Sequence, residues 1–296
     1  MVSSATRRAD GLIALSSRTD CILRPVLESK MNRHDTTKQT LMKEKIIESL
    51  RQLEKEKKIR ILLAVESGSR AWEFSSPDSD YDVRFVYVHT LDWYLTVFPK
   101  KDVIKRMSED HLFDLSGWEL RKTLQLLYKS NPNLADWLLT DQIYIAQPEF
   151  LAEIRKMQAY YYNPIHAMHH FLSIAKNHDE KYLSKNGYTL KRFLYFVRGL
   201  LACEYIESKK MHPPVAFEQL VDATVKDQNI KQEISKIIAL KRISKESDSV
   251  AIDENLMNYA LNLFEKHKAG IVDFRPELSS HHSAPLDQML RKWITA

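Results

Sequence analysis

The sequence predicts an α+β protein in which a small mixed β-sheet flanked by helices is followed by an all-helical half. Two short apolar runs, at 59–65 and 82–88, have the length of buried strands. The segment before them carries apolar residues at helical spacing, and strand signals fade after about residue 148. We therefore expect a sheet-containing domain over residues 38–148 and a helical domain over 149–296.

The front half opens with an amphipathic helix and continues into two neighbouring strands. Over 38–57, apolar positions recur at helical spacing among charged residues, and this helix leads into the strand at 59–65. Residues 70–79, which include Pro77, form a connection too short for a crossover helix. The strand at 82–88 is therefore expected beside the first, in a mixed sheet.

The rest of the chain is expected to be a hairpin followed mainly by helices. Before residue 148 the pattern favours a short helix or turn at 91–98, a hairpin of 103–107 with 112–115, a helix ending near 130, and a second helix after Asn131-Pro132-Asn133. Beyond it, helices are expected at 148–160, 164–182, 189–208, 228–243 and 253–268. The tail over 273–296 carries no clear pattern.

Composition sets limits on the class of protein. The chain has 296 residues, and its 44 lysines and arginines against 39 acids give a net charge of +5, which permits an anionic substrate without singling out nucleic acid. Two cysteines, Cys21 and Cys203, are too few for a disulfide framework or zinc site, so a reducing, cytoplasmic compartment is expected. No run approaches the roughly 18 apolar residues of a membrane span, so no membrane partner is expected.

Residues 1–37 are expected to be a disordered or non-native extension. Their arginines and serines are similar to those of a transit peptide, but the acids Asp10, Asp20 and Glu28 do not fit one. Met31 begins a segment that is typical of a natural start.

A Gly-Ser corner and a pair of acids flank the connection between the two strands. Gly68-Ser69 follows the first strand, Asp80 and Asp82 enter the second, and ten residues separate Ser69 from Asp80. Free backbone N–H groups and a hydroxyl at such a corner suit a phosphate group. Side chains two apart on a strand share a face, about 6.5–7 Å apart. The pattern predicts a nucleoside triphosphate held through divalent metal.

Mg²⁺ or Mn²⁺ is the expected cation. At an effective dielectric of about 20, the two aspartates repel each other by about 2.5 kcal/mol, which a cation between them offsets. Two Mg²⁺ ions about 3.5–4 Å apart would suit the pair. An Asp-x-Asp on an edge strand is often only a solvated face. The Gly-Ser corner and the flanking apolar residues favour the metal interpretation here.

A third carboxylate is expected from Asp114, in the strand-like stretch 112–115. The alternative is Glu119, whose place at a helix start already explains an acid. We favour Asp114 for that reason. It could also serve as the general base that deprotonates an acceptor hydroxyl.

These residues resemble a known family. The Gly-Ser corner, the ten-residue spacer, Asp-x-Asp and a later strand Asp resemble the signature of polymerase-β-type nucleotidyltransferases. The longer strings are similar to one branch, the RNA-ligase-associated nucleotidyltransferase-like group of bacteria and phages. The resemblance covers roughly residues 45–265 and is carried by 66–72, 76–85, 92–95, 114–122, 129–132, 191–198 and Pro213-Pro214.

The resemblance implies a small metal-dependent nucleotidyltransferase core with a helical partner domain. It implies that triphosphate contacts Gly68 and Ser69, and that the catalytic metal is held by Asp80, Asp82 and Asp114. One residue departs from the family, because a Gly is expected where Glu73 stands. The Glu73 carboxylate would either weaken triphosphate binding by repulsion or face water.

Basic residues are expected to complete the nucleotide site. Arg70 and Arg84 lie close to the acids in sequence and would balance their charge, and Arg70 is counted with the nucleotide-binding residues. Lys191, Tyr195 and Arg198 are spaced i, i+4 and i+7, so they share a helix face. This stripe would either close over the triphosphate and stack a base, or form a solvated basic face.

Histidines and tryptophans are given structural roles. His166, His169, His170 and His178 lack the neighbouring ligands that would complete a zinc site. Trp72, Trp93, Trp118 and Trp137 are expected in the core rather than as a base-stacking platform.

The expected activity is transfer of a nucleoside monophosphate from a triphosphate, with ATP as the expected donor, to an acceptor hydroxyl with release of pyrophosphate. The acceptor is RNA, protein or a small molecule. Two alternatives stay open: a catalytically silent nucleotide- or RNA-binding module on the same fold, and a nucleotidylating toxin. Growth arrest relieved by Asp80→Asn would indicate the toxin.

Overall fold

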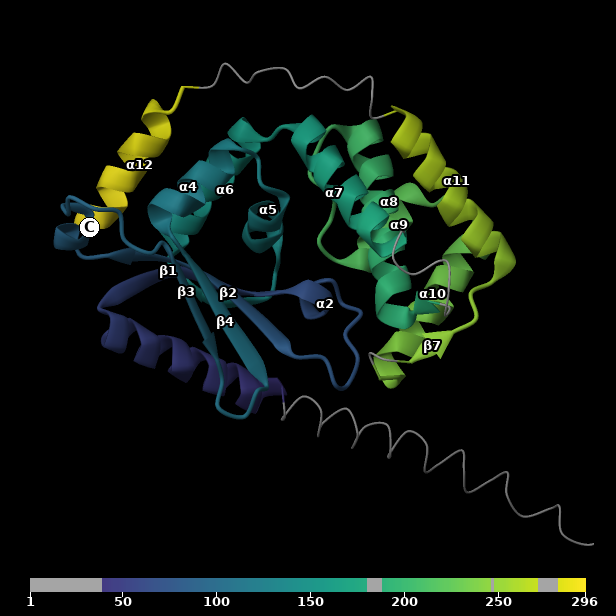
Figure 1. Ribbon diagram of the computed structural model, residues 1–296, viewed down its shortest axis with the longest axis horizontal. Helices are drawn as coiled ribbons and strands as arrows, with labels where there is room; N and C mark the ends of the chain where they lie inside the picture. The colour runs from purple at the N-terminus through teal and green to yellow at the C-terminus, as the bar shows by residue number, and fades with distance from the viewer. Residues whose placement is uncertain (1–38, 180–187, 246–247, 271–281) are drawn as a thin grey trace, which may run out of the picture. The chain divides into compact units, whose positions relative to one another are not determined.

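The computed structural model describes residues 39–179, 188–245, 248–270 and 282–296 (Figure 1). The predicted extension over 1–37, and Cys21 within it, lie outside these residues. The described chain consists of a mixed sheet followed by helices. The predicted α+β class is therefore confirmed.

A five-stranded sheet has the order β3-β4-β2-β1-β5. Strands β2 and β4 pair in parallel, and the other neighbours pair antiparallel. The strands are β1 (Ile59–Ser67), β2 (Tyr81–His89), β3 (Val103–Met107), β4 (Phe113–Glu119) and β5 (Ile143–Ala146). The predicted pairing of the first two strands and the predicted hairpin are confirmed, while β5 was not predicted.

Helices make up most of the remaining described chain. Residues 39–57 are helical. The others are α2 (Gly68–Ala71), α3 (Leu91–Tyr94), α4 (Leu120–Tyr128), α5 (Pro132–Leu139), α6 (Pro148–Tyr161), α7 (Pro164–Asp179), α8 (Leu190–Lys209), α9 (Phe217–Thr224), α10 (Gln228–Ile243), α11 (Glu254–Gly270) and α12 (Ala284–Thr295). A two-residue pair, β6 (Tyr188–Thr189) with β7 (Ser249–Val250), lies among them. Within the described ranges, no helix has the length and hydropathy needed to cross a bilayer.

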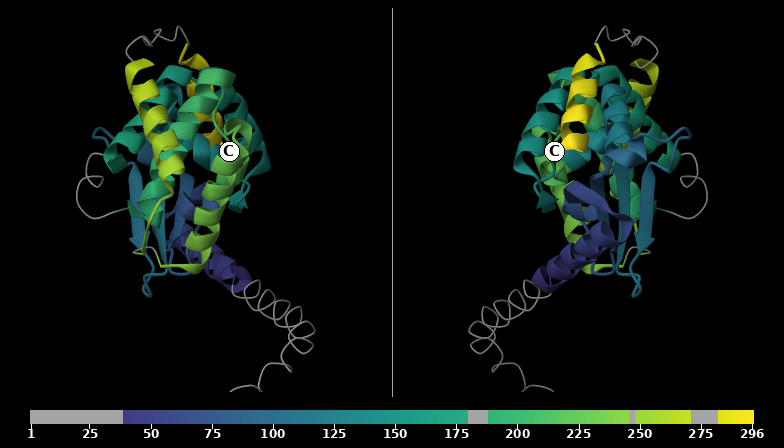
Figure 2. Two further views of the ribbon diagram at one scale, coloured as in Figure 1. Left: turned by 90° about the vertical axis from the view of Figure 1, so that its right-hand side faces the viewer. Right: turned by 90° about the vertical axis from the view of Figure 1, so that its left-hand side faces the viewer.

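One face of the sheet packs against α4, α5, α6 and α12. Their buried side chains form a single hydrophobic cluster with those of β1 and β2. Figures 1 and 2 show α12, in yellow, on the same side as α4, far from it in sequence, and the two helices are in contact. Helices on both sides of the predicted boundary at residue 148 therefore cover the sheet. The boundary itself stays a prediction.

A second hydrophobic cluster joins α7 to α11, and it also receives Phe74 from the connection between β1 and β2. Helical residues hold that connection by polar contacts as well. Arg242 donates to the carbonyl of Glu73 at 2.8 Å, and Lys241 donates from Nζ to Ser76 Oγ at 2.7 Å. The segment that leads into Asp80 is thus fixed by helix α10.

Candidate active site

The register of β2 and β4 brings two of the predicted acids together. Asp82 and Asp114 are directly paired residues of these parallel strands. Arg84 bridges them, with ion pairs of 2.7 Å to Asp82 Oδ1 and 2.9 Å to Asp114 Oδ2. Because both carboxylates reach the same guanidinium, they lie on the same side of the sheet.

Asp80 lies just before β2 and is exposed. Its charge nevertheless reaches Asp82. Burial raises the pKa of Asp82, the charges of Asp114 and Asp80 raise it further, and those of Arg84 and Lys191 oppose the rise. Asp80 and Lys191 of α8 therefore belong to the same electrostatic cluster as Asp82 and Asp114.

Gly68 is required at the corner after β1 for two reasons. Its φ is +64°, in the left-handed region that favours glycine. A Cβ at this position would lie 2.4 Å from Asp82 Oδ2, closer than two atoms can approach. The corner and the acid are therefore packed against each other.

The neighbours of Gly68 are occupied by local contacts. Ser69 is buried, whereas Ser67 lines the cavity described below. Arg70 donates to the carbonyls of Asp80 at 3.1 Å and Ser79 at 2.6 Å, and its guanidinium lies 3.7 Å from the ring centroid of Tyr81. Arg70 therefore holds in place the two residues that precede β2.

The three residues of the predicted stripe on α8 have different surroundings. Lys191 is half-buried and lies within electrostatic reach of Asp82. Tyr195 packs edge-on against Trp72. Arg198 is only 3% exposed and pairs with Asp136 at 3.4 Å, so it does not lie on an open face. Tyr195 and Arg198 both contact Trp72, but Arg198 is turned inward by Asp136 of α5, so the stripe is not an open basic face at this position.

A cavity of about 410 Å³ adjoins the acids. Alternate residues of a strand share one face, and the cavity follows one face of β2 and β4. Helix α5 contributes residues at i, i+3 and i+4, which also share a face. The lining residues are Ser67, Gly68, Trp72, Asp82, Arg84, Lys105, Asp114, Ser116, Trp118, Asn133, Asp136 and Trp137.

Sequence reasoning missed Glu66 as a part of the site. Its side chain is 1% exposed and accepts hydrogen bonds from the backbone N–H of Asp82, at 2.8 Å, and from the hydroxyl of Tyr144. Burial raises the pKa of Glu66 to about 7. The available signal was an acid two residues before Gly68, near the end of an otherwise apolar strand.

Two other predicted features have clear structural explanations. Glu119 caps α4, since its carboxylate accepts from the backbone N–H groups of Arg121 and Lys122. This confirms the explanation of Glu119 as a helix-start acid. Glu73 has φ +67°, a conformation that glycine adopts without strain, which explains why a Gly is expected there. Its side chain is exposed.

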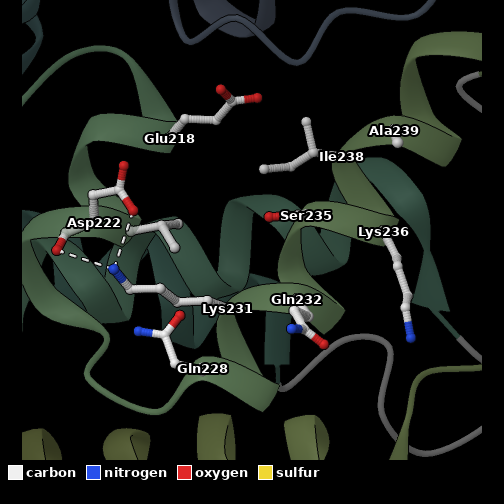
Figure 3. Close-up of a pocket in the computed structure, with 10 residues that line it drawn as sticks. Glu218, Asp222, Gln228, Lys231, Gln232, Ser235, Lys236, Ile238 and Ala239 are labelled. Atoms are coloured by element: carbon white, nitrogen blue, oxygen red, sulfur yellow. Dashed lines mark hydrogen bonds and ion pairs between the residues drawn. The ribbon is translucent and has the colours of Figure 1, made fainter.

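Further polar groups lie elsewhere on the helices. Glu204, Glu207 and His267 have their ligand atoms close together, but Lys266 forms ion pairs with both glutamates and supplies positive charge there. A larger hollow, of about 650 Å³, lies between α9 and α10 (Figure 3). It is lined by polar residues such as Lys231, which pairs with Asp222 at 3.1 Å.

The gathered acids, the left-handed glycine and the mixed sheet define a nucleotidyltransferase of the polymerase-β type. The chain belongs to the RNA repair pathway DNA polymerase beta family, whose model matches residues 42–292. This membership supports a general nucleotidyltransferase role.

Two individual proteins are similar to this chain. The uncharacterized protein YcgL of Bacillus subtilis (strain 168) is 39% identical over 207 residues, which cover 70% of this chain and 79% of that protein. A solved structure of a nucleotidyltransferase-like protein from Exiguobacterium sibiricum 255-15 aligns with a TM-score of 0.33 and 13% identity, over 83% of this chain and 80% of that one.

Proposed function

We propose that this protein transfers a nucleoside monophosphate from a nucleoside triphosphate, with ATP as the expected donor, to an acceptor hydroxyl and releases pyrophosphate. The observation that carries the proposal is the convergence of Asp82 and Asp114 on one cationic group beside Gly68. RNA, a protein or a small molecule is the acceptor. A cytoplasmic setting belongs to the same proposal.

The donor set suits Mg²⁺ or Mn²⁺. Carboxylate oxygens are the hard ligands these ions prefer, and the position between Asp82 and Asp114 already accommodates positive charge from Arg84. Asp80, Asp82 and Asp114 would hold the metal. When bound, it would neutralise phosphate charge and make the acceptor oxygen more acidic.

The remaining steps fall to the chain's own residues. Gly68 lets the triphosphate approach the backbone closely, and Lys191 and Lys105 are the cations placed to bind its phosphate oxygens. The acceptor oxygen forms a bond to the α-phosphorus as the bond from that phosphorus to pyrophosphate breaks. Asp114 accepts the hydroxyl proton, as a general base within reach of the reacting group.

The test uses purified full-length chain with Mg²⁺ and triphosphates labelled at the α-phosphate, with and without total RNA. We expect label transfer with stoichiometric pyrophosphate. Asp82→Asn and Asp114→Asn should each lower the rate at least about 100-fold, as losses of charge-stabilising groups do. Asp92→Asn, an exposed acid on α3, is the matched control and should leave the rate unchanged.

Two outcomes would contradict the proposal. If triphosphate binds with metal but no label is transferred to any acceptor, the protein is a nucleotide-binding module. If neither triphosphate binding nor pyrophosphate release is detected, the transferase activity is excluded.

A further inference from the structure

The cavity beside the acids has a second wall made of indole rings. Trp72, Trp118 and Trp137 all line it, together with the acids on β2 and β4. These tryptophans were predicted to be core residues, and Trp137, which is 5% exposed, is one. Trp72 and Trp118 are instead half-buried and border the open space.

Trp118 lies on the same strand face as Asp114. The two residues are separated by four positions on β4, so their side chains leave the same side of the sheet. Trp137 of α5 stacks on Trp118, with ring centroids 3.8 Å apart and an angle of 30° between the planes. This buried partner holds the Trp118 indole in one orientation.

Trp72 is held just as firmly. Its Nε1 donates to Asp136 Oδ2 at 3.3 Å, and the guanidinium of Arg198 lies 4.3 Å from its ring centroid. Arg198 is itself paired with Asp136 and buried. An ion pair between a buried arginine and a half-buried aspartate therefore fixes the orientation of an indole that borders the cavity.

Helix α5 adds a polar group to this wall. Asn133, Asp136 and Trp137 occupy positions i, i+3 and i+4, which form one helix face, and all three line the cavity. The carboxylate of Asp136 is engaged by Trp72 and Arg198. Asn133 is exposed, and its amide offers both donors and an acceptor, as recognition of a base edge requires.

From this arrangement we infer that the indole wall is the subsite for the nucleobase of the triphosphate, with Trp118 as the stacking residue and Asn133 as the residue that contacts the base edge. The inference rests on the proposed function. One cavity of about 410 Å³, within the range of small-ligand sites, is lined both by the acids with Gly68 and by flat aromatic rings. A nucleoside triphosphate likewise combines a polyanion with a planar ring.

The test compares a triphosphate that has a base with one that has none. Dissociation constants for ATP and for inorganic tripolyphosphate are measured with Mg²⁺ by calorimetry, on the wild-type chain, Trp118→Leu and Trp118→Phe. Leucine fills the space without a flat face, and phenylalanine keeps one. Trp93→Leu is the control, because Trp93 is also half-buried but stacks on His89 outside the cavity.

We expect Trp118→Leu to weaken ATP binding about tenfold or more, the size of a lost base–aromatic stack. Trp118→Phe should keep most of the wild-type affinity for ATP. The affinity for tripolyphosphate should be the same in the wild type, the two Trp118 variants and Trp93→Leu. Asn133→Ala, a change at an exposed position, should alter the ranking of ATP, GTP, CTP and UTP.

Three results would overturn the inference. Unchanged ATP affinity in Trp118→Leu, or an equal loss for tripolyphosphate, would remove the base subsite and leave the proposed function standing. If the wild-type chain binds neither ligand, the proposed function fails and the subsite fails with it. Circular dichroism and urea unfolding of each variant establish that the compared proteins are folded.

Discussion

Arg84 controls the balance of charge between the two strand acids. It forms ion pairs with both Asp82 and Asp114, and its side chain is 20% exposed. A guanidinium in that position competes with any divalent cation for the same carboxylates.

We predict that Arg84→Met tightens Mn²⁺ binding about fivefold, equivalent to ~1 kcal/mol, because partly exposed ion pairs contribute about that much. The free-ion signal in electron paramagnetic resonance measures the change. The control is Arg106→Met. Arg106 lies on the neighbouring strand β3 and pairs with Glu56, so its loss should leave Mn²⁺ binding unchanged. Weaker Mn²⁺ binding in Arg84→Met would contradict the assignment of these carboxylates as metal ligands.

Glu66 makes stability depend on pH. Burial raises its pKa from an ordinary 4.5 to about 7 in the folded protein. The folded state therefore holds this proton more tightly than the unfolded state. The stabilising contribution is complete below about pH 4.5 and is lost as pH rises through about 7.

We predict that the free energy of unfolding of the wild type falls by about 3 kcal/mol relative to Glu66→Gln between pH 4.5 and 7, since one pKa unit corresponds to about 1.4 kcal/mol. Urea unfolding in metal-free buffer at several pH values measures the difference. Parallel curves for the two proteins would show that Glu66 keeps an ordinary pKa.

The Asp-x-Asp spacing and the strand-like stretch 112–115 led to the prediction that Asp82 and Asp114 lie near each other, and the two residues are directly paired on β2 and β4. The spacing did not predict the role of Glu66, because its partner Tyr144 comes from β5. The charge balance expected of Arg84 is present, and its pairing with Asp114 depends on the parallel register of β4.

Among the strands, β4 depends on a glycine for its packing. A Cβ at Gly117 would lie 2.2 Å from the ring of Phe85, which is fully buried on β2. The ring and the glycine are directly paired across the parallel strands. Any side chain at Gly117 must therefore displace a ring that has no free space around it.

We predict that Gly117→Ala lowers the free energy of unfolding by about 2–3 kcal/mol, the cost of overpacking a core. Urea unfolding measures it. In a Phe85→Leu background, the same substitution should cost at least 1 kcal/mol less, because the smaller side chain leaves room for the methyl group. Equal costs in both backgrounds would mean that contact with Phe85 is not the cause.

Strand β5 and the helices α9 and α12 were not predicted. Strand β5 is four residues long and is recognisable only by its antiparallel pairing with β1. Helix α12 lies in the tail for which no element was predicted, although its buried Leu286, Met289 and Trp293 recur at helical spacing and complete the sheet cluster. In contrast, α10 covers residues 228–243 as expected, because its apolar period is regular.

Helix α10 contacts the connection between β1 and β2 through Lys241. This lysine is fully buried, and its Nζ donates to Ser76 Oγ, within the connection that leads into Asp80. No periodicity argument could have placed a lysine beside a serine 165 positions away.

We predict that Lys241→Met lowers kcat/KM for nucleotidyl transfer between tenfold and about 100-fold, because small displacements of reacting groups have effects of that size. Lys236→Met removes an exposed lysine from the same helix and should leave the activity unchanged. Circular dichroism should show the helices retained in both. Full activity in folded Lys241→Met would show that α10 does not position the acids.

The late position of α12 in the chain has a consequence during synthesis. Strands β1 to β5 leave the ribosome long before residues 284–295, which pack on them. Until that segment emerges, the apolar surface of α4 and β2 that α12 covers is exposed to chaperones and to other nascent chains.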